Sequence, residues 1–543
     1  MPGIVAGRNL FPSLVLTESI ALLHSPQATP SADDPLPDGD GRRRAAAWGA
    51  VLGYASTLLA IARNILLVPV YLKFFSLAEY GAWLASGAAL VQIIVTDFGL
   101  SGVLMQKVSA LHGARDSRRL GQVISSGIAA SIGLAVLLTV LCVAGASFLP
   151  VMKGLDSLEV LTVRNCLLLA VGANAIGIVS SMSFGIVRSF QHALVAGFAV
   201  FVADLVNIGA TLLLLMTGAG LYSIPCGLII RSTLSAAFLL GYLTYLCRAK
   251  FAAKMTLSLP EVRELFVDSW RSFWSSLALK LQTQSNVFFV GVFLSPQVAA
   301  IYGLTVRAQE TISNLLTQIN SAMLPSMAHL LGSKNETRFK ALFLRILPAM
   351  SLFAAAGLVA VVSVNKSFVA LWVSPTAFAG QTVSLLAGLA VWVASIGSLA
   401  YDSLFAQGEF KAIARTFSTT ALIHVLILVA LLRFGLWAAP TATLVSTALW
   451  ALLFWRKVLT KLKFSVRELR GAFTDVAITA CIGSLSVFGF LHWAEQPTNW
   501  FQLIVVAIGI VAGFLLIVFA CSARMRAVIT EEGRVTWRSL RWR

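Results

Sequence analysis

The sequence predicts an all-α, polytopic membrane protein with about fourteen transmembrane helices, and three observations lead to this fold class. First, 58% of the 543 residues are hydrophobic and only 12% are charged, which is more apolar surface than a soluble domain can bury. Second, apolar stretches alternate with short polar breaks from residue 46 onward, and each has the roughly 20 residues that a helix needs to cross a bilayer. Third, the stretches lack the two-residue alternation of barrel strands, which leaves helices as the only spanning structure.

The order of these stretches predicts two similar halves. The predicted spans lie near 46–72, 80–104, 121–149, 161–187, 195–217, 220–247, 271–294, 297–325, 341–364, 377–406, 410–432, 436–455, 472–492 and 500–522. In chain order, the segments are a disordered cytoplasmic tail rich in Pro, Asp, Ser and Gly (1–45), a first six-helix half (46–247), a cytoplasmic linker (248–270), a second six-helix half (271–455), a basic cytoplasmic linker (456–470), a C-terminal helix pair (471–522) and a basic cytoplasmic tail (523–543).

The positive charges predict the orientation. With the N-terminus in the cytoplasm, most of the 41 Lys and Arg residues fall in breaks on the inner side, as the positive-inside rule requires. The outer loops hold Lys73, Lys153, Lys366 and Arg433. Both termini are therefore expected in the cytoplasm, and the net charge of +18 is assigned to the membrane surface and not to a nucleic-acid partner.

Several enzyme classes lack support in the sequence. The predicted outer loops are too short to carry a catalytic domain, and the chain has no GxxxxGK[ST], HExxH or GxSxG motif. The six cysteines lie in or beside apolar stretches without a CxxC pair or an accompanying His, so neither a disulfide framework nor a metal site is indicated. We predict a protein that is not an enzyme and has no catalytic residue, metal or cofactor.

Charged residues inside the predicted spans mark a candidate site. A central Arg or Lys costs about 2.5–3.5 kcal/mol on insertion scales, so such residues should face the protein interior or a wet cavity. The cations within spans are Arg63, Arg164, Arg231, Lys280 and Arg307. In the eighth span, polar residues follow Arg307 at three- or four-residue steps, at Glu310 or Thr311, Asn314, Thr317 or Gln318, and Ser321, which places them on one helical face.

Polar stripes on other spans suggest that they share one aqueous chamber with this face. A cationic chamber predicts an anionic substrate, and Arg suits phosphate because its planar fork donates two parallel hydrogen bonds. Acidic residues in the same chamber could instead bind a coupling proton or sodium ion. The candidate substrate-binding residues are Arg63, Asn64, Lys280, Gln284, Arg307, Asn314 and Gln318, and the candidate ion-coupling residues are Asp97, Asp204 and Glu310.

A structural role for these charges is the alternative. Arg307 can pair with Glu310 three residues on, and Asp97 or Asp204 could neutralise Arg63 or Arg231 across helices. Arg63 and Lys280 have no partner within reach on their own helices. For these two residues, we favour the cavity interpretation.

The segment from Arg63 and Asn64 through LLVPVYLKFFSLAEYGAWLAS (Leu66 to Ser86) resembles the opening of the polysaccharide-type, Wzx-like flippases of the multidrug/oligosaccharidyl-lipid/polysaccharide (MOP) exporter superfamily. The Glu-Tyr-Gly-x-Trp turn is its most specific part, and Arg63 falls at the basic position of the family's first helix. A weaker copy, FLSPQVAAIYGLT, begins at Phe293 and places Ser295 and Tyr302 at the positions of Ser76 and Trp83. Two six-helix halves related by a repeat are what this superfamily implies.

The resemblance covers roughly residues 46–455 and implies a function. The expected substrate is an undecaprenyl-pyrophosphate-linked oligosaccharide, such as the repeat unit of O-antigen or exopolysaccharide, moved from the cytoplasmic to the periplasmic leaflet of the bacterial inner membrane by alternating access. The implied partners are this lipid-linked oligosaccharide, membrane lipids and the polymerase and glycosyltransferases of the same pathway. The last two spans resemble the extra pair of the lipid II flippases. The alternatives are a cation-coupled multidrug exporter of the same superfamily and a membrane-embedded enzyme of glycan assembly.

Overall fold

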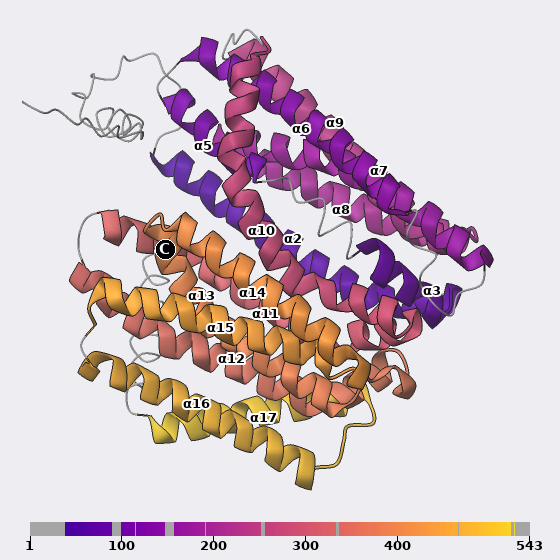
Figure 1. The fold of residues 1–543 in the computed structure, drawn as a ribbon, viewed down its shortest axis with the longest axis vertical. Helices are drawn as coiled ribbons and strands as arrows, with labels where there is room; N and C mark the ends of the chain where they lie inside the picture. Colours follow the sequence, from indigo (N-terminus) through magenta and orange to yellow (C-terminus); the bar gives the residue numbers. More distant parts are fainter. Residues whose placement is uncertain are drawn as a thin grey trace, which may run out of the picture.

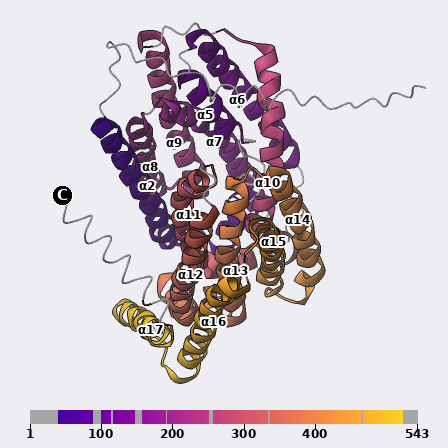
Figure 2. The ribbon, with the colours of Figure 1, turned by 90° about the vertical axis from the view of Figure 1, so that its left-hand side faces the viewer.

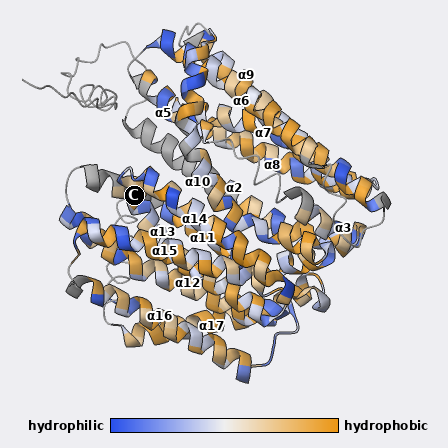
Figure 3. Ribbon diagram, viewed as in Figure 1, coloured by the Kyte–Doolittle hydropathy of each residue, from blue (hydrophilic) through white to orange (hydrophobic). Residues whose placement is uncertain are grey.

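The computed structural model is helical throughout the part of the chain that it describes, which is residues 39–88, 99–113, 116–146, 157–190, 192–250, 256–332, 336–464, 466–522 and 526 (Figure 1). The predicted all-α fold is confirmed. Among these residues, ten helices are long and apolar enough to cross a membrane, and they coincide with the third to sixth and the ninth to fourteenth predicted spans. Figure 3 shows hydrophobic residues along the helices and hydrophilic residues gathered at many of their ends.

The helices form two lobes and a C-terminal pair. The first lobe contains α2 (Gly39–Phe74), α3 (Leu77–Ala82), η1 (Trp83–Ala88), α5 (Leu100–Gly113), α6 (Ser117–Ala146), α7 (Ser157–Ser189), α8 (Ala193–Met216), η3 (Gly220–Tyr222), α9 (Ser223–Tyr245) and η4 (Leu246–Lys250). The second contains α10 (Leu259–Phe293), α11 (Pro296–Gly332), α12 (Glu336–Trp372), η5 (Pro375–Ala377), α13 (Gln381–Ala406), α14 (Phe410–Leu431), η6 (Leu432–Phe434) and α15 (Ala438–Leu462). The pair is α16 (Val466–Trp493) and α17 (Trp500–Cys521).

The element bounds fall close to the predicted spans, but helices extend into the predicted tail and linkers. Helix α2 begins at Gly39, inside the expected disordered tail (1–45), and α15 and α16 cover most of the expected linker 456–470. A further difference is at α10. This helix begins at Leu259, inside the segment 248–270 that the sequence suggested as a linker. Most of the expected N-terminal tail (1–38) and nearly all of the C-terminal tail lie outside the described residues. Asp97 also lies outside them.

Equivalent turns in the two halves are capped in the same way. The Ser76 hydroxyl accepts a hydrogen bond from the backbone N–H of Glu79, and the Glu79 carboxylate accepts one from the N–H of Ser76, which is a capping box at the start of α3. At the start of α11, the Ser295 hydroxyl accepts from the N–H of Val298 at 3.2 Å. The weak sequence repeat therefore marks two helix starts that use the same local chemistry.

These two capped turns pack against each other where the lobes meet. We call this region, at the end of α2 and the start of α3 and α11, the closed end. A Cβ atom added to Gly81 would lie 1.8 Å from the carbonyl oxygen of Pro296, so the backbones are as close as glycine permits. The Trp372 indole also donates to the carbonyl of Ile65 at 2.7 Å, which ties α12 to α2. Toward the opposite end, the helices of the two lobes diverge (Figure 1).

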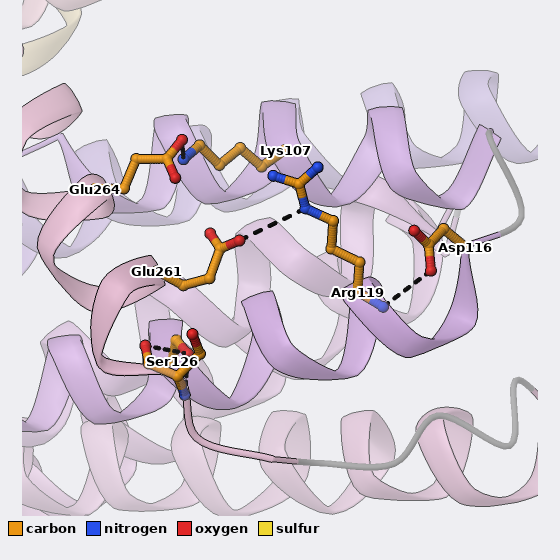
Figure 4. A network of polar contacts seen from close by, with 7 residues as sticks. Lys107, Asp116, Arg119, Ser126, Glu261 and Glu264 are labelled. Carbon is orange, nitrogen blue, oxygen red and sulfur yellow. Dashed lines mark hydrogen bonds and ion pairs between the residues drawn. The ribbon is translucent and has the colours of Figure 1, made fainter.

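Helix α10 connects the lobes at that opposite end, which carries many of the Lys and Arg residues and is called the basic end here. Lys107 of α5 pairs with Glu264 of α10 at 2.7 Å, and Arg119 of α6 pairs with Glu261 at 3.6 Å (Figure 4). The Ser126 hydroxyl bonds the backbone of Ser258, just before α10 (Figure 4). Farther along, α10 packs against α14 and α11 of the second lobe. The first turns of α10 are thus anchored to one lobe and the rest to the other.

The Lys107–Glu264 pair should contribute measurably to this anchor. We expect Lys107→Glu to lower the thermal unfolding midpoint of the purified protein by a few degrees, because it places two like charges side by side. Adding Glu264→Lys should restore most of the loss, with a coupling free energy of about 0.5–1 kcal/mol for a partly exposed pair. Equal midpoints for the single and double variants would show that the pair contributes nothing.

The C-terminal pair lies on the outer side of the second lobe, next to α12 (Figure 2). The side chains of Phe514 and Val518 are fully buried in a cluster with Val359 and Val362 of α12. The Ser351 and Thr479 hydroxyls form a buried hydrogen bond between α12 and α16. The pair is therefore attached to the second lobe mainly through α12, with a further contact between Trp455 of α15 and Phe473 of α16.

Candidate functional site

A cavity of about 1040 Å³ lies between the two lobes. Its first-lobe wall comes mainly from α2, α3, α8 and α9, and its second-lobe wall from α10, α11, α13, α14 and α15. The charged side chains that line it are Arg63, Lys280, Arg307, Glu310 and Asp402. Amides and hydroxyls make up much of the rest, so the wall can hydrogen-bond a polar ligand at many points.

The structure brings most of the candidate residues into this one cavity. The residues that line it are Arg63, Asn64, Lys280, Gln284, Arg307, Glu310 and Asn314. Asp204 is buried behind Arg63 and is not part of the lining. Gln318 is exposed on α11 outside the lining, whereas its neighbour Thr317 faces the cavity. At this level of α11 the residue that lines the cavity is therefore Thr317, which directly precedes the candidate Gln318.

The three lining cations come from different helices but lie at a similar depth. Arg63 is eleven residues from the end of α2 at Phe74, Lys280 is thirteen from the end of α10 at Phe293, and Arg307 is eleven from the start of α11 at Pro296. At a rise of about 1.5 Å per residue, each lies roughly 16–20 Å from the closed end. Since a bilayer core is about 30 Å thick, cations at this depth would lie near its middle with the closed end at one membrane surface.

Arg63 belongs to a charge cluster within the first lobe. Its guanidinium lies 3.6 Å from the Asp204 carboxylate of α8, which also accepts a hydrogen bond from Arg231 of α9. The Asn207 amide, oriented to satisfy both neighbours, accepts from Arg63 at 3.1 Å and donates to the Gly227 carbonyl at 3.0 Å. The predicted alternative, in which Asp204 neutralises Arg63 or Arg231 across helices, is therefore confirmed for both arginines. One carboxylate shared by two guanidiniums still leaves the cluster with a net positive charge.

Arg307 forms the second charge cluster, at the boundary between the lobes. It pairs with Glu310 at 3.2 Å on its own helix, which confirms the predicted alternative. Its guanidinium also lies within electrostatic reach of Tyr80, the Tyr of the Glu-Tyr-Gly-x-Trp turn in α3, and both residues line the cavity. Arg307 therefore connects the cavity wall of the second lobe to the closed end of the first.

The sequence interpretation missed one acidic residue of the cavity. Asp402 lies on α13 with Ser395 and Ser398 at three- and four-residue steps, and all three line the cavity. The Asn320 amide of α11 donates a hydrogen bond to the Ser398 hydroxyl. The three- and four-residue spacing that marked the eighth span is also present in the tenth, so this signal could have identified Asp402.

Comparisons with known proteins agree with the fold. The model of a family described as polysaccharide biosynthesis proteins matches residues 50–331, which is more than half of the chain. The structure of the lipid II flippase MurJ, in an inward closed conformation, is similar with a TM-score of 0.63 and 15% identity, over 87% of this chain and 98% of that one. The eukaryotic MATE transporter AtDTX14 is similar with a TM-score of 0.60 and 15% identity, over 80% of this chain and 100% of that one.

A MOP superfamily transporter from Pyrococcus furiosus is also similar, with a TM-score of 0.57 and 15% identity over 78% of this chain and 96% of that one. No curated protein matches the chain by sequence. At such identities the structural likeness concerns the fold, while the family model concerns the sequence itself. This chain therefore belongs to the family of polysaccharide biosynthesis proteins, and it is a multi-pass membrane protein with the fold of the MOP superfamily transporters.

Proposed function

We propose that the protein is a flippase that moves an undecaprenyl-pyrophosphate-linked oligosaccharide, such as an O-antigen or exopolysaccharide repeat unit, from the cytoplasmic to the periplasmic leaflet of a bacterial inner membrane. The observation that carries the proposal is the layer of Arg63, Lys280 and Arg307 at one depth in a polar cavity between two lobes. A diphosphate carries enough negative charge to engage several cations, and the arginine forks match its oxygens.

The remaining lining suits the other parts of such a substrate. Amides and hydroxyls such as Asn64, Gln284 and Asn314 replace the water around sugar hydroxyls. The isoprenoid tail can stay in the lipid while the headgroup occupies the cavity. Rocking of the lobes about the closed end would then expose the headgroup to each leaflet in turn. Asp204 and Glu310, both paired with arginines, are proposed to hold those arginines in place and remain candidates for ion coupling.

Reconstitution tests the proposal directly. Vesicles containing the protein and a fluorescent undecaprenyl-pyrophosphate-linked trisaccharide should show movement of the label to the leaflet opposite the one where it was added. The measurement is the fraction of label that a membrane-impermeant quencher reaches over time. Movement no faster than in protein-free vesicles would contradict the proposal.

The charge of the cavity disfavours export of cationic drugs. Three cations and two carboxylates, those of Glu310 and Asp402, line the cavity, and Glu310 is paired with Arg307. A cationic drug would therefore meet a site with excess positive charge. Uptake of ethidium into the same vesicles tests the alternative of a multidrug exporter. Ethidium transport without movement of the lipid would favour that alternative. We propose no enzymatic step and no cofactor; polymerase and glycosyltransferases of the pathway are proposed partners.

The proposed orientation places both termini and the basic end in the cytoplasm. A periplasm-active reporter fused after Lys366, at the end of α12 near the closed end, is then expected to be active. The same reporter fused after Lys463, which follows α15 at the basic end, should be silent. The opposite pattern would invert the proposed direction of transport.

A further inference from the structure

We infer that the second lobe carries a saccharide subsite formed by Asp402 and Ser398 of α13 and Asn320 of α11, separate from the cationic layer. The inference rests on the proposed function and adds where the glycan binds. All three residues line the cavity.

The subsite contains a buried acceptor that needs a ligand. Ser398 donates its proton to the Ser395 carbonyl at 2.8 Å, so its oxygen can only accept from Asn320. This fixes the Asn320 amide with its nitrogen toward Ser398. The Asn320 side chain is 6% exposed, and among the described residues its carbonyl oxygen has no hydrogen-bond partner. A buried acceptor left unpaired is unfavourable, and a donor on a ligand would remove that cost.

Asp402 supplies the second acceptor. It lies four residues after Ser398 on α13, so their Cβ atoms are about 5–6 Å apart on one helical face. Within the described part of the chain, its carboxylate has no ion pair or hydrogen bond. Asn320 and Asp402 both neighbour Ser398, one through a hydrogen bond and the other through one helical turn, and together they can accept from a pair of hydroxyl donors.

The surroundings favour a sugar over a metal cation. Tyr401, Phe405 and Trp450 line the cavity near this group, and aromatic faces carry the partial negative charge that attracts the C–H groups of a sugar ring. A hard cation such as calcium takes six or more oxygen ligands, whereas Asn320 and Asp402 offer only two groups with free oxygens. No group of three or more His, Cys, Asp or Glu suited to a metal occurs in the described residues.

The position along the helices fits a glycan attached to a bound diphosphate. Asn320 is thirteen residues beyond Arg307 on the same helix, which is about 20 Å toward the basic end. A diphosphate at Arg307 cannot reach it, but an attached chain of several sugars can. The subsite should therefore sense the length of the glycan and not the carrier.

Binding to defined lipids tests the inference with the full chain in nanodiscs. The probes are undecaprenyl diphosphate alone and the same carrier bearing one, three or five neutral hexoses. The unmodified protein should bind the three- or five-sugar lipid more tightly than the bare carrier. Asp402→Asn and, separately, Asn320→Leu should each weaken binding of those longer lipids by roughly tenfold and leave the affinity for the bare carrier unchanged.

A matched control is Glu409→Gln, which removes a carboxylate at the same end of the bundle but outside the cavity, where it pairs with Lys461. It should change neither affinity. The subsite is overturned if added sugars do not strengthen binding to the unmodified protein. It is also overturned if both subsite variants bind the long lipids with normal affinity, or if they lower the affinity for the bare carrier by the same factor as for the long lipids. A loss confined to sodium-dependent binding would also overturn it, in favour of a cation site.

The same titrations separate this inference from the proposed function. Arg63→Ala should weaken the binding of every probe, including the bare carrier, because Arg63 is proposed to contact the diphosphate that all the probes share. Normal binding of the bare carrier to Arg63→Ala would contradict the cationic layer, while a sugar-dependent gain that disappears in Asp402→Asn would still support the subsite.

Discussion

Replacing Arg63 with alanine is expected to abolish glycan export while leaving the amount of folded protein in the membrane unchanged. The reason lies in the cluster behind it, because Asp204 keeps its hydrogen bond with Arg231 when Arg63 is removed. The loss of a bidentate, charge-assisted contact to the diphosphate should cost at least tenfold in transport. The measurement is surface glycan in cells together with protein abundance in the membrane fraction.

Three further variants complete this test. Lys280→Ala should also lose transport with normal abundance, and Arg63→Lys should retain part of the activity, since an ammonium keeps the charge but not the fork. Lys366→Ala removes an exposed cation of α12 outside the cavity and should behave like the unmodified protein. Normal export by both Arg63→Ala and Lys280→Ala would refute the role of the cationic layer.

Asp204→Ala should give the opposite phenotype. It leaves Arg63 and Arg231 facing each other without their shared carboxylate, and breaking such a buried cluster destabilises a protein by about 3–5 kcal/mol. We therefore expect low abundance and a lowered unfolding midpoint, measured on the purified variant. Normal stability with lost transport would instead indicate a direct role in coupling.

Gly81→Ala is expected to shift the protein away from the described conformation. The added methyl would overlap the Pro296 carbonyl at the closed end, and overpacking of this kind costs about 1–3 kcal/mol. If the lobes rock, the strain is relieved by opening the closed end and bringing the basic ends together. The ratio of the two states should then change by roughly 5- to 150-fold.

Spin labels at Arg118 of α6 and Lys411 of α14, exposed residues at the basic ends of the two lobes, measure this change by pulsed electron resonance. The exposed native Cys481 and Cys521 are first replaced with alanine. The distance should shorten in Gly81→Ala. Gly102→Ala on α5 is the matched control, because a Cβ there meets no atom of the described residues within 4 Å. An unchanged distance distribution in Gly81→Ala would refute rocking about this contact.

The polar stripe on α11 shows what sequence periodicity could predict about the cavity lining. Spacing placed Arg307, Glu310 and Asn314 on one face of α11, and all three line the cavity. It did not distinguish Thr317 from Gln318, because adjacent residues differ by only 100° around a helix and both three- and four-residue steps stay on one face. The rotation of α11 is set by its packing against α12 and α13.

The pairing of Arg63 illustrates what periodicity could not supply. Its partner, Asp204, is 141 positions away in the chain and meets it only because α2 packs against α8. The sequence allowed Asp97 or Asp204 as partners of Arg63 or Arg231. It had no means of choosing, or of finding that one carboxylate serves both arginines.

The sequence by itself determined that this protein is a helical bundle in the membrane, with two related halves and cations that must avoid lipid. Composition and the cost of burying charge suffice for those conclusions, because both act locally along the chain. Tertiary structure alone decided which charges pair between helices, how each helix is rotated toward the cavity, and where the lobes touch. Those features depend on contacts between helices distant in sequence, and a one-residue turn of a helix exchanges a lining residue for a lipid-facing one.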